Sequence, residues 1–286
     1  MDNRNDVREF LASRRARITP EQAGLPRYGG TRRVPGLRRE EVALLAGVSP
    51  DYYIRLERGN LSGVSGTVLD AISKALRLDD AEHAHLHDLA RTSNTTTRAR
   101  RRPAPHVRPG VQRLIDAMTD APAFIRNGRL DMLSANRLAY ALYSPAFQTP
   151  ARPVNLARFC FLDPQATVFY PDWQGAADQT VALLRTEAGR DPYDRDLSEL
   201  VGELSTRSGE FRVRWAAHDV RLHLTGVKHF RHPVVGDLDL PFEALPLPAD
   251  PGLTLTAYSA EPGTPSADGL RLLASWSTTV EPVDHR

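Results

Sequence analysis

The segment Leu37–Gly59 constrains the fold of this chain more than any other stretch. Its first half repeats apolar residues at helical spacing, at Val42, Ala43 and Ala46. This spacing predicts a short helix whose small side chains let a second helix pack closely. Gly47 suits the left-handed backbone that ends a helix, and Ser49 followed by Pro50 is a start signal for the next one.

The second half of the segment has the pattern of another short helix. Tyr53 and Leu56, three positions apart, form its predicted buried stripe, and Gly59 ends it. Three residues are left pointing outward: Asp51, Tyr52 and Arg55. Two short helices joined by a turn that contains glycine make a helix-turn-helix, whose second helix enters the major groove of DNA. We therefore expect this segment to bind DNA.

Charge is distributed unevenly along the chain. The net charge of +2 divides into +7 over residues 1–110 and −5 over residues 111–286. A basic N-terminal part is typical of a nucleic-acid-binding domain, and the acidic remainder is unsuited to that task. Lys74 and Lys228 are the only lysines among 37 basic residues, which we interpret as the codon bias of a high-GC bacterial genome.

Composition excludes several classes of protein. No apolar run approaches the roughly 20 residues of a membrane span. The first residues lack the basic-then-apolar layout of a signal peptide. The single cysteine, Cys160, excludes an intrachain disulfide and a cysteine-rich zinc module, and its apolar neighbours favour a buried thiol over a nucleophile. We expect a cytoplasmic protein without a membrane partner.

Residues 1–92 are expected to form a helical domain. Apolar periodicity predicts three helices besides the two of the motif, near residues 5–17, 69–78 and 81–90. The loop before the motif contains glycines and the pair Arg32 and Arg33, which is either an arm that contacts phosphates or the minor groove, or a solvated loop. Residues 93–110 are basic and proline-rich, as in an interdomain linker.

Residues 111–286 have the pattern of an α+β domain. Two strands are expected around a turn at Asn127 and Gly128, followed by four helices up to residue 205. Further strands are then expected at Phe211–Trp215, Val220–Phe230, Gly236–Leu247 and Leu253–Ser259. The simplest architecture is an antiparallel sheet with helices over one face and a pocket between them.

Several stretches resemble a known family of regulators. The motif resembles Xre-type helix-turn-helix repressors at Ala43, Ala46–Ser49 and Leu56–Gly59. More narrowly, the chain is similar to the MmyB-like branch at Pro35–Ala43 and Tyr52–Glu57. The second half is similar to the ligand-binding domain of that branch at Phe169–Trp173, Phe211–His218 and His232–Leu240. The resemblance covers nearly the whole chain.

This resemblance implies a bacterial transcription regulator of two domains. The first is an all-α, five-helix DNA-binding domain of the Xre or lambda-repressor type. The second is a PAS-like α+β ligand-binding domain with an antiparallel sheet. The implied ligand is small, hydrophobic and fatty-acid-like. The domain bounds that we expect are 1–92 for the first domain, 93–110 for the linker and 111–286 for the second domain.

Nine residues are candidates for DNA contact: Arg32, Arg33, Arg38, Arg39, Ser49, Asp51, Tyr52, Arg55 and Arg58. Arg38 and Arg39 begin the first motif helix, where side chains reach phosphates. Arg55 is the candidate for a bidentate contact with guanine. For Asp51, contact with a cytosine amine and a helix-capping role are equally open. Arg58 either reaches a phosphate or pairs within the fold.

Nine residues of the second domain are candidates for ligand contact: Asn136, Tyr140, Phe159, Phe169, Trp173, Arg214, Trp215, His218 and His229. The aromatic members either line a pocket or belong to the core, and core is expected for most of them. The polar members are candidates for orienting a ligand head group.

A histidine cluster in the first domain is a candidate metal site. His83 and His87 lie four residues apart on one predicted helix face. Because no third ligand of matched spacing accompanies them, we interpret them as a solvated face rather than a zinc site. The sequence contains no zinc-protease, phosphate-loop or dinucleotide-binding motif, so we expect neither a cofactor nor enzyme activity.

The sequence thus predicts a one-component transcription factor. We expect a homodimer that binds a pseudo-palindromic operator in double-stranded DNA, with a ligand in the second domain changing operator affinity. Two alternatives stay open for the second domain. It is an enzyme or protein-binding module, or it only dimerises the chain and fills its interior with its own side chains.

Overall fold

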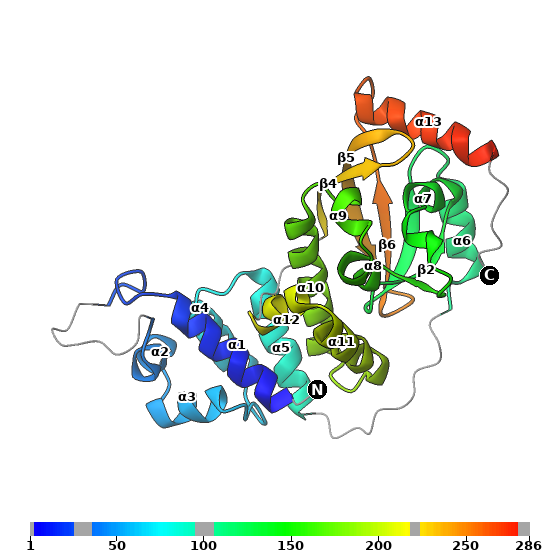
Figure 1. Ribbon diagram of the computed structural model, residues 1–286. Helices are drawn as coiled ribbons and strands as arrows, with labels where there is room; N and C mark the ends of the chain where they lie inside the picture. The colour runs from blue at the N-terminus through cyan, green and yellow to red at the C-terminus, as the bar shows by residue number, and fades with distance from the viewer. Residues whose placement is uncertain (1–2, 26–35, 95–105, 218–223, 280–286) are drawn as a thin grey trace. The chain divides into compact units, whose positions relative to one another are not determined.

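The computed structural model describes residues 3–25, 36–94, 106–217 and 224–279 (Figure 1). Contacts between Cα atoms divide the chain into two compact units. Unit 1 comprises Met1–Arg100, Arg185–Gly202 and Val213–Leu222, and unit 2 comprises Arg101–Leu184, Glu203–Arg212 and His223–Arg286. Within the described ranges, every helix is too short or too polar to cross a membrane.

Unit 1 begins with the five helices that the sequence predicts. They are α1 (Asn3–Arg17), α2 (Arg39–Ala46), α3 (Pro50–Glu57), α4 (Gly66–Ala75) and α5 (Asp80–Asn94). Their inner faces share one apolar core, in which Val42 of α2 and both Tyr53 and Leu56 of α3 are fully covered. The two motif helices therefore bury the predicted stripes and leave their other faces exposed.

A six-stranded sheet organises unit 2. Its strands are β1 (Ala123–Asn127), β2 (Asp131–Ala135), β3 (Val154–Asn155), β4 (Thr225–His232), β5 (Gly236–Pro246) and β6 (Leu253–Tyr258). They lie in the order β3-β2-β1-β6-β5-β4, and each neighbouring pair is antiparallel. The predicted α+β architecture is thus confirmed.

The remaining helices lie before, between and after these strands. They are α6 (Pro109–Asp116), α7 (Arg137–Leu142), a 3-10 turn (Ala146–Gln148), α8 (Leu156–Leu162), α9 (Ala166–Phe169), α10 (Trp173–Arg190), α11 (Arg195–Arg207), α12 (Gly209–Ala216) and α13 (Pro265–Thr279). Residues 173–184 of α10 belong to unit 2 and residues 185–190 to unit 1. One continuous helix is therefore shared by the two units.

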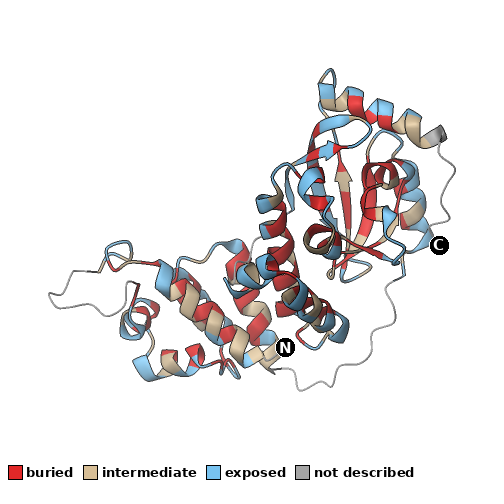
Figure 2. Cartoon of the chain, in the orientation of Figure 1, coloured by how far each residue is buried: buried red, intermediate tan, exposed pale blue. Residues whose placement is uncertain are grey.

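The two faces of the sheet are covered differently because side chains alternate along a strand. On β1, Ile125 joins the small core under α6, whereas Phe124 joins the large core with α7, α8 and α9. On β6, Leu255 faces α6 and Tyr258 faces the large core. Figure 2 shows the buried residues gathered along α7 and the strands. The large core is the side on which a cavity opens.

Two local predictions are corrected. Residues 211–215 form part of α12 rather than a strand. Ser208 starts this helix, since its hydroxyl accepts a hydrogen bond from the backbone N–H of Phe211 at 3.2 Å. The β1–β2 hairpin is present, but the residue with positive φ in its turn is Leu130, at 67°, and not Gly128.

Candidate DNA interface and ligand cavity

The turn between α2 and α3 has the geometry that the sequence predicts. Gly47 adopts a left-handed conformation with φ of 66° and caps α2. The hydroxyl of Ser49 accepts a hydrogen bond from the backbone N–H of Tyr52 at 3.2 Å, and Pro50 occupies the first position of α3. Ser49 therefore caps the helix with the same oxygen that we expected to contact DNA.

Glu57, at the end of α3, ties three helices together. Its carboxylate accepts two hydrogen bonds from Arg15 of α1, at 2.8 and 3.2 Å, and one from Arg39 of α2 at 3.1 Å. The Glu57 side chain is only 2 % exposed. A buried carboxylate shared by two guanidinium groups holds α3 at a fixed angle to its neighbours. The structure thus gives Arg39 a partner within the fold, although half of its side chain remains exposed.

The outer face of α3 presents polar residues from its first turns. Asp51 and Arg55 are exposed and Tyr52 is half-buried. The guanidinium carbon of Arg55 lies 4.7 Å from the centre of the Tyr52 ring, a cation–π arrangement that aligns the two side chains. Arg58, which caps α3, is also exposed. These residues share one surface that is available for contact.

The remaining DNA candidates lie at or before the start of α2. The backbone N–H of Arg38 donates to the carboxylate of Glu41 at 2.6 Å, and its guanidinium lies 3.4 Å from Glu40. Arg32 and Arg33 lie outside the described residues.

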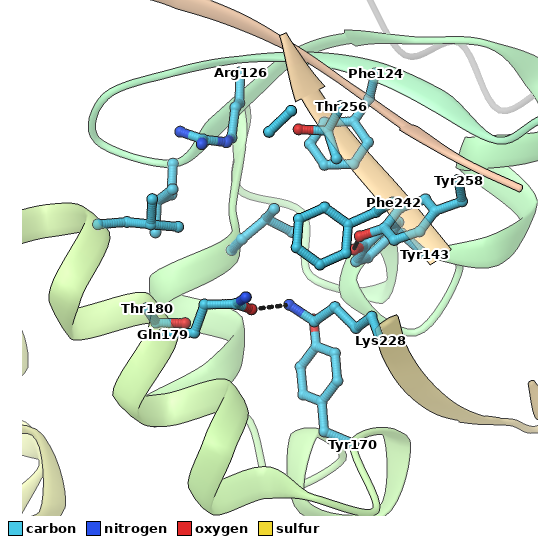
Figure 3. Close-up of a pocket in the computed structure, with 14 residues that line it drawn as sticks. Phe124, Arg126, Tyr143, Tyr170, Gln179, Thr180, Lys228, Phe242, Thr256 and Tyr258 are labelled. Atoms are coloured by element: carbon cyan, nitrogen blue, oxygen red, sulfur yellow. Dashed lines mark hydrogen bonds between the residues drawn. The ribbon is translucent and has the colours of Figure 1, made fainter. Parts of the chain in front are cut away.

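A cavity opens in unit 2 between the sheet and the first part of α10 (Figure 3). Its free volume is about 50 Å³, which is room for a few water molecules. Fourteen residues line it: Phe124, Arg126, Leu130, Tyr143, Leu156, Tyr170, Gln179, Thr180, Leu183, Lys228, Phe242, Ala244, Thr256 and Tyr258. None of these fourteen described residues is Asp or Glu. The cavity therefore combines aromatic walls with the two cationic side chains of Arg126 and Lys228.

Lys228 is the polar group at the floor of this cavity. Its ammonium donates to the side-chain oxygen of Gln179 at 3.1 Å and lies 5.1 Å from the centre of the Tyr170 ring. Burial lowers the pKa of Lys228 to about 8, and the nearby charge of Arg126 acts in the same direction. An anion beside this ammonium would oppose both effects and stabilise the charged form.

The aromatic wall contains hydrogen-bonded tyrosine hydroxyls. The hydroxyls of Tyr143 and Tyr258 are 2.6 Å apart and hydrogen-bonded. Burial raises the pKa of Tyr143 and that of Tyr258, so both hydroxyls are neutral near pH 7. The wall therefore contributes no negative charge.

Asn136 was predicted to contact the ligand, but its side-chain amide is hydrogen-bonded to backbone groups instead. Its side-chain oxygen accepts from the N–H groups of Ala123 and Ala139, at 3.1 and 2.8 Å. Its side-chain nitrogen donates to three backbone carbonyls, those of Ile115, Met118 and Ala121. Asn136 thus caps α7 and fixes the approach to β1, and it does not line the cavity.

The predicted aromatic candidates belong to the core around the cavity. Phe159 and Phe169 are buried with their ring centres 5.6 Å apart. Tyr140 packs its ring edge-on against Phe147. The indole N–H of Trp173 donates to the carbonyl of Cys160 at 2.9 Å. None of these four predicted residues is among the fourteen that line the cavity.

The other described candidates are also absent from the cavity lining. Arg214 and Trp215 belong to α12 and to unit 1, so the strand that we expected at these residues is a helix. His229 is on β4, but adjacent residues of a strand face opposite sides. Lys228 therefore faces the cavity, while His229 is exposed and its Nδ1 lies 2.6 Å from Asp239. His218 lies outside the described residues.

Lys228 and Arg126 are the charged residues among the fourteen that line the cavity, and neither was a predicted ligand contact. One signal was available, since Lys228 is one of only two lysines in an arginine-rich chain. We had interpreted that rarity as codon bias alone. Lys228 lies on the same face of β4 as the buried residues Phe230 and His232, so a lysine in an arginine-rich chain could have been singled out.

Arg185 continues α10 from the cavity residues into unit 1. Its guanidinium lies 3.9 Å from the centre of the Trp215 ring, donates to the Trp215 carbonyl and pairs with Asp6 of α1 at 3.5 Å. The residue is only 3 % exposed, and burial lowers its pKa to about 10. Within unit 1, α1 is thus ion-paired to the end of α10.

Two family models match the chain. The model described as the MmyB-like transcription regulator ligand binding domain matches residues 107–273, and the model described as a helix-turn-helix domain matches residues 8–86. No curated protein matches the chain. The first match contains all fourteen cavity residues, and the second contains all of α2, α3 and α4.

Proposed function

This chain belongs to the family of MmyB-like transcription regulators, and we propose that it is a one-component repressor or activator controlled by a small apolar acid. The helix-turn-helix domain binds DNA, and the second domain binds a small molecule. Binding of the acid in the cavity of unit 2 changes the affinity of α3 for its operator. The protein acts in the cytoplasm, where its DNA target lies.

One observation supports our proposal for the class of ligand. The ammonium of Lys228 is next to an aromatic cavity whose lining includes Arg126 and no carboxylate. Lys228 is half-buried. A desolvated cation without an opposite charge is unfavourable, and a ligand carboxylate supplies that charge. The aromatic side chains then contact the apolar part of the ligand. A fatty acid has both parts, so we propose a fatty-acid-like ligand.

The size of the cavity determines how such a ligand acts. Pockets for drug-sized ligands measure about 300–1,000 Å³, far above the volume of about 50 Å³ in this structure. A fatty acid therefore enters only when lining side chains move apart. Gln179 and Thr180 lie on α10, so their displacement shifts this helix. Because α10 continues to Arg185, which pairs with Asp6, α10 is the element that carries the change to α1.

The operator is bound by the outer face of α3. Arg55 contacts a guanine with two hydrogen bonds, Asp51 accepts from a cytosine amine, and Arg58 contacts a phosphate. Arg38 adds a phosphate contact at the start of α2, and Arg32 and Arg33 add further contacts with DNA. The charge of +7 on residues 1–110 favours all of these contacts with phosphates.

We further propose that the chain is a homodimer with bounds of 1–92 for the DNA-binding domain and 111–286 for the ligand-binding and dimerising domain. Helix-turn-helix proteins bind two half-sites about one helical turn apart, and a dimer presents two α3 helices with that spacing.

The ligand proposal is tested by matched probes and variants. Dodecanoic acid and dodecanol are titrated into wild-type protein and into Lys228→Met by calorimetry, with Lys74→Met as the control that removes the other lysine. We expect the acid to bind wild type at least about 10-fold more tightly than Lys228→Met, because a hydrogen bond to a charged group is lost. Dodecanol should not distinguish the variants. Equal binding of acid and alcohol by wild type contradicts the proposal.

The small cavity also favours a second candidate. Tyr143, Phe242 and Tyr258 already occupy much of the interior, as expected for a domain that only dimerises the chain. In that case neither dodecanoic acid nor dodecanol binds, native mass spectrometry of gently purified protein shows no bound small molecule, and the oligomeric state depends on unit 2 alone.

A further inference from the structure

The structure brings a third metal-ligating group to the two histidines of α5. His83 and His87 lie one turn apart on α5, and both direct Nε2 at the same carboxylate oxygen of Asp70 on α4, at 2.9 and 3.0 Å. Asp70 precedes His83 by 13 residues, so the spacing along the chain did not reveal it. The two imidazole rings have their centres 4.4 Å apart.

We propose that Asp70, His83 and His87 form a zinc site that bridges α4 and α5. One oxygen and two nitrogen donors lie within 4.8 Å of one another in this group. A tetrahedral zinc ion with bonds of about 2.0–2.1 Å separates its ligand atoms by about 3.3 Å. The two distances that involve Asp70 need to grow by only a few tenths of an ångström. Zinc then replaces the two Nε2 protons, which move to Nδ1.

The protein holds these ligands on rigid elements. Ile72 of α4 and Leu86 of α5 are fully buried in the same apolar core. They anchor the two helices next to the proposed ligands, so little conformational freedom is lost when the ion binds. Preorganised ligands on two helices distinguish this cluster from a chance meeting of mobile surface side chains.

The donor set and its exposure identify the class of ion. Two imidazoles and one carboxylate favour zinc over magnesium and calcium, which prefer oxygen ligands. The side chains are 60 %, 42 % and 32 % exposed for Asp70, His83 and His87, so water has access to a fourth coordination position. The site therefore supplies three protein ligands, and water supplies the fourth.

The structure also supplies a matched control. His229 and Asp239 form a second exposed histidine–aspartate pair, with Nδ1 and the carboxylate oxygen 2.6 Å apart. Two ligands hold zinc more weakly than three, so substitutions at His229 should leave the zinc affinity of the chain unchanged.

The test uses the full chain without a histidine tag, freed of metal with a chelator. Zinc is titrated against a chromophoric competitor, and native mass spectrometry counts the bound ions. We expect one zinc ion per chain in wild type and in His229→Gln. His83→Gln, His87→Gln and Asp70→Asn should each weaken this binding by more than about 10-fold, at least the loss found for groups that only support a metal ligand. Magnesium should not compete.

Stability provides a second readout. Bound zinc raises the thermal midpoint of wild type and of His229→Gln, because the ion binds only the folded state. The three ligand variants should keep the midpoint of the metal-free wild type and show no rise with zinc. If wild type binds zinc no more tightly than the double variant His83→Gln/His87→Gln, the proposal is overturned.

Discussion

The ammonium of Lys228 donates a hydrogen bond to the side-chain oxygen of Gln179 across 3.1 Å, and this contact joins β4 to α10 at the cavity. A ligand carboxylate competes with Gln179 for the same ammonium. The contact is therefore the point at which occupancy of the cavity is expected to change the position of α10.

The first prediction concerns the pH dependence of ligand binding. The pKa of Lys228 is lowered to about 8, so the residue is charged below that pH and neutral above it. Binding of dodecanoate should be constant near pH 6–7 and weaken as pH rises through about 8, as calorimetry at several pH values will show. Lys228→Arg stays charged and should remove this dependence. If dodecanoate binding weakens equally with pH in wild type and in Lys228→Arg, a group other than Lys228 causes the pH dependence.

The second prediction concerns the stability of the protein without ligand. The pKa of Lys228 is about 8 in the folded protein and near its ordinary value of 10.5 in the unfolded chain. Between these values the unfolded state binds more protons, so the free energy of unfolding rises with pH. Wild type should therefore gain stability relative to Lys228→Met as pH rises from about 8 to about 10 in urea titrations. No change in the difference between the two proteins would show that the ammonium is not desolvated.

The third prediction concerns the carboxylate that ties α3 to its neighbours. Glu57→Gln leaves Arg15 with a buried charge and no opposite charge. We expect a loss of about 3 kcal/mol in the free energy of unfolding, measured by chemical denaturation. Glu40 pairs with Arg38 at 3.4 Å, but its side chain is 65 % exposed. Glu40→Gln should therefore cost less than about 1 kcal/mol.

The fourth prediction concerns base recognition by α3. Arg55→Ala should cost about 1–3 kcal/mol of binding and relax the preference at one base pair. Fluorescence anisotropy with an operator selected from random DNA measures both effects at physiological salt. Arg8→Ala removes an equally charged, exposed residue from α1 and should leave the base preference intact. If Arg55→Ala keeps both the operator affinity and the base preference, another residue of α3 makes the base contact.

The fifth prediction concerns the coupling along α10. Asp6→Asn removes the charge that pairs with Arg185 and leaves Arg185 stacked on Trp215. The variant should bind dodecanoate as wild type does, but the acid should have less effect on its operator affinity. Asp80→Asn, an exposed change on α5, should preserve the full effect. If Asp6→Asn responds to the acid like wild type, another contact transmits the change.

Predictions from local signals were the most successful. The helix boundary at Gly47, the cap at Ser49 and the buried pair Tyr53 and Leu56 depend on residues within one turn of each other, and all are present. The failure at residues 211–215 was also local. Apolar residues alternate at Phe211, Val213 and Trp215, which is also the pattern of a strand. In the structure Val213 is 70 % exposed on α12. Ser208, whose hydroxyl caps this helix, is the local signal that indicates a helix start.

Contacts between residues far apart in the sequence could not be predicted from local signals. Asn136 is separated from Ile115 by 21 residues, and only the folded chain shows that backbone groups use its whole amide. Likewise, Asp70 completes the histidine pair of α5 from another helix. Residue type and spacing indicate which side chains can do chemistry, but not which of them meet.

The helix-turn-helix of α2, the turn and α3 can be predicted from the amino-acid sequence, because caps, glycine and apolar spacing act within a few residues. The α+β character of the second domain can be predicted as well, from the alternation along β5 and β6. That Lys228, and not His229, faces the cavity is visible only in the folded chain. That choice depends on strand register and on what packs above the strand, and both are set by residues far away along the chain.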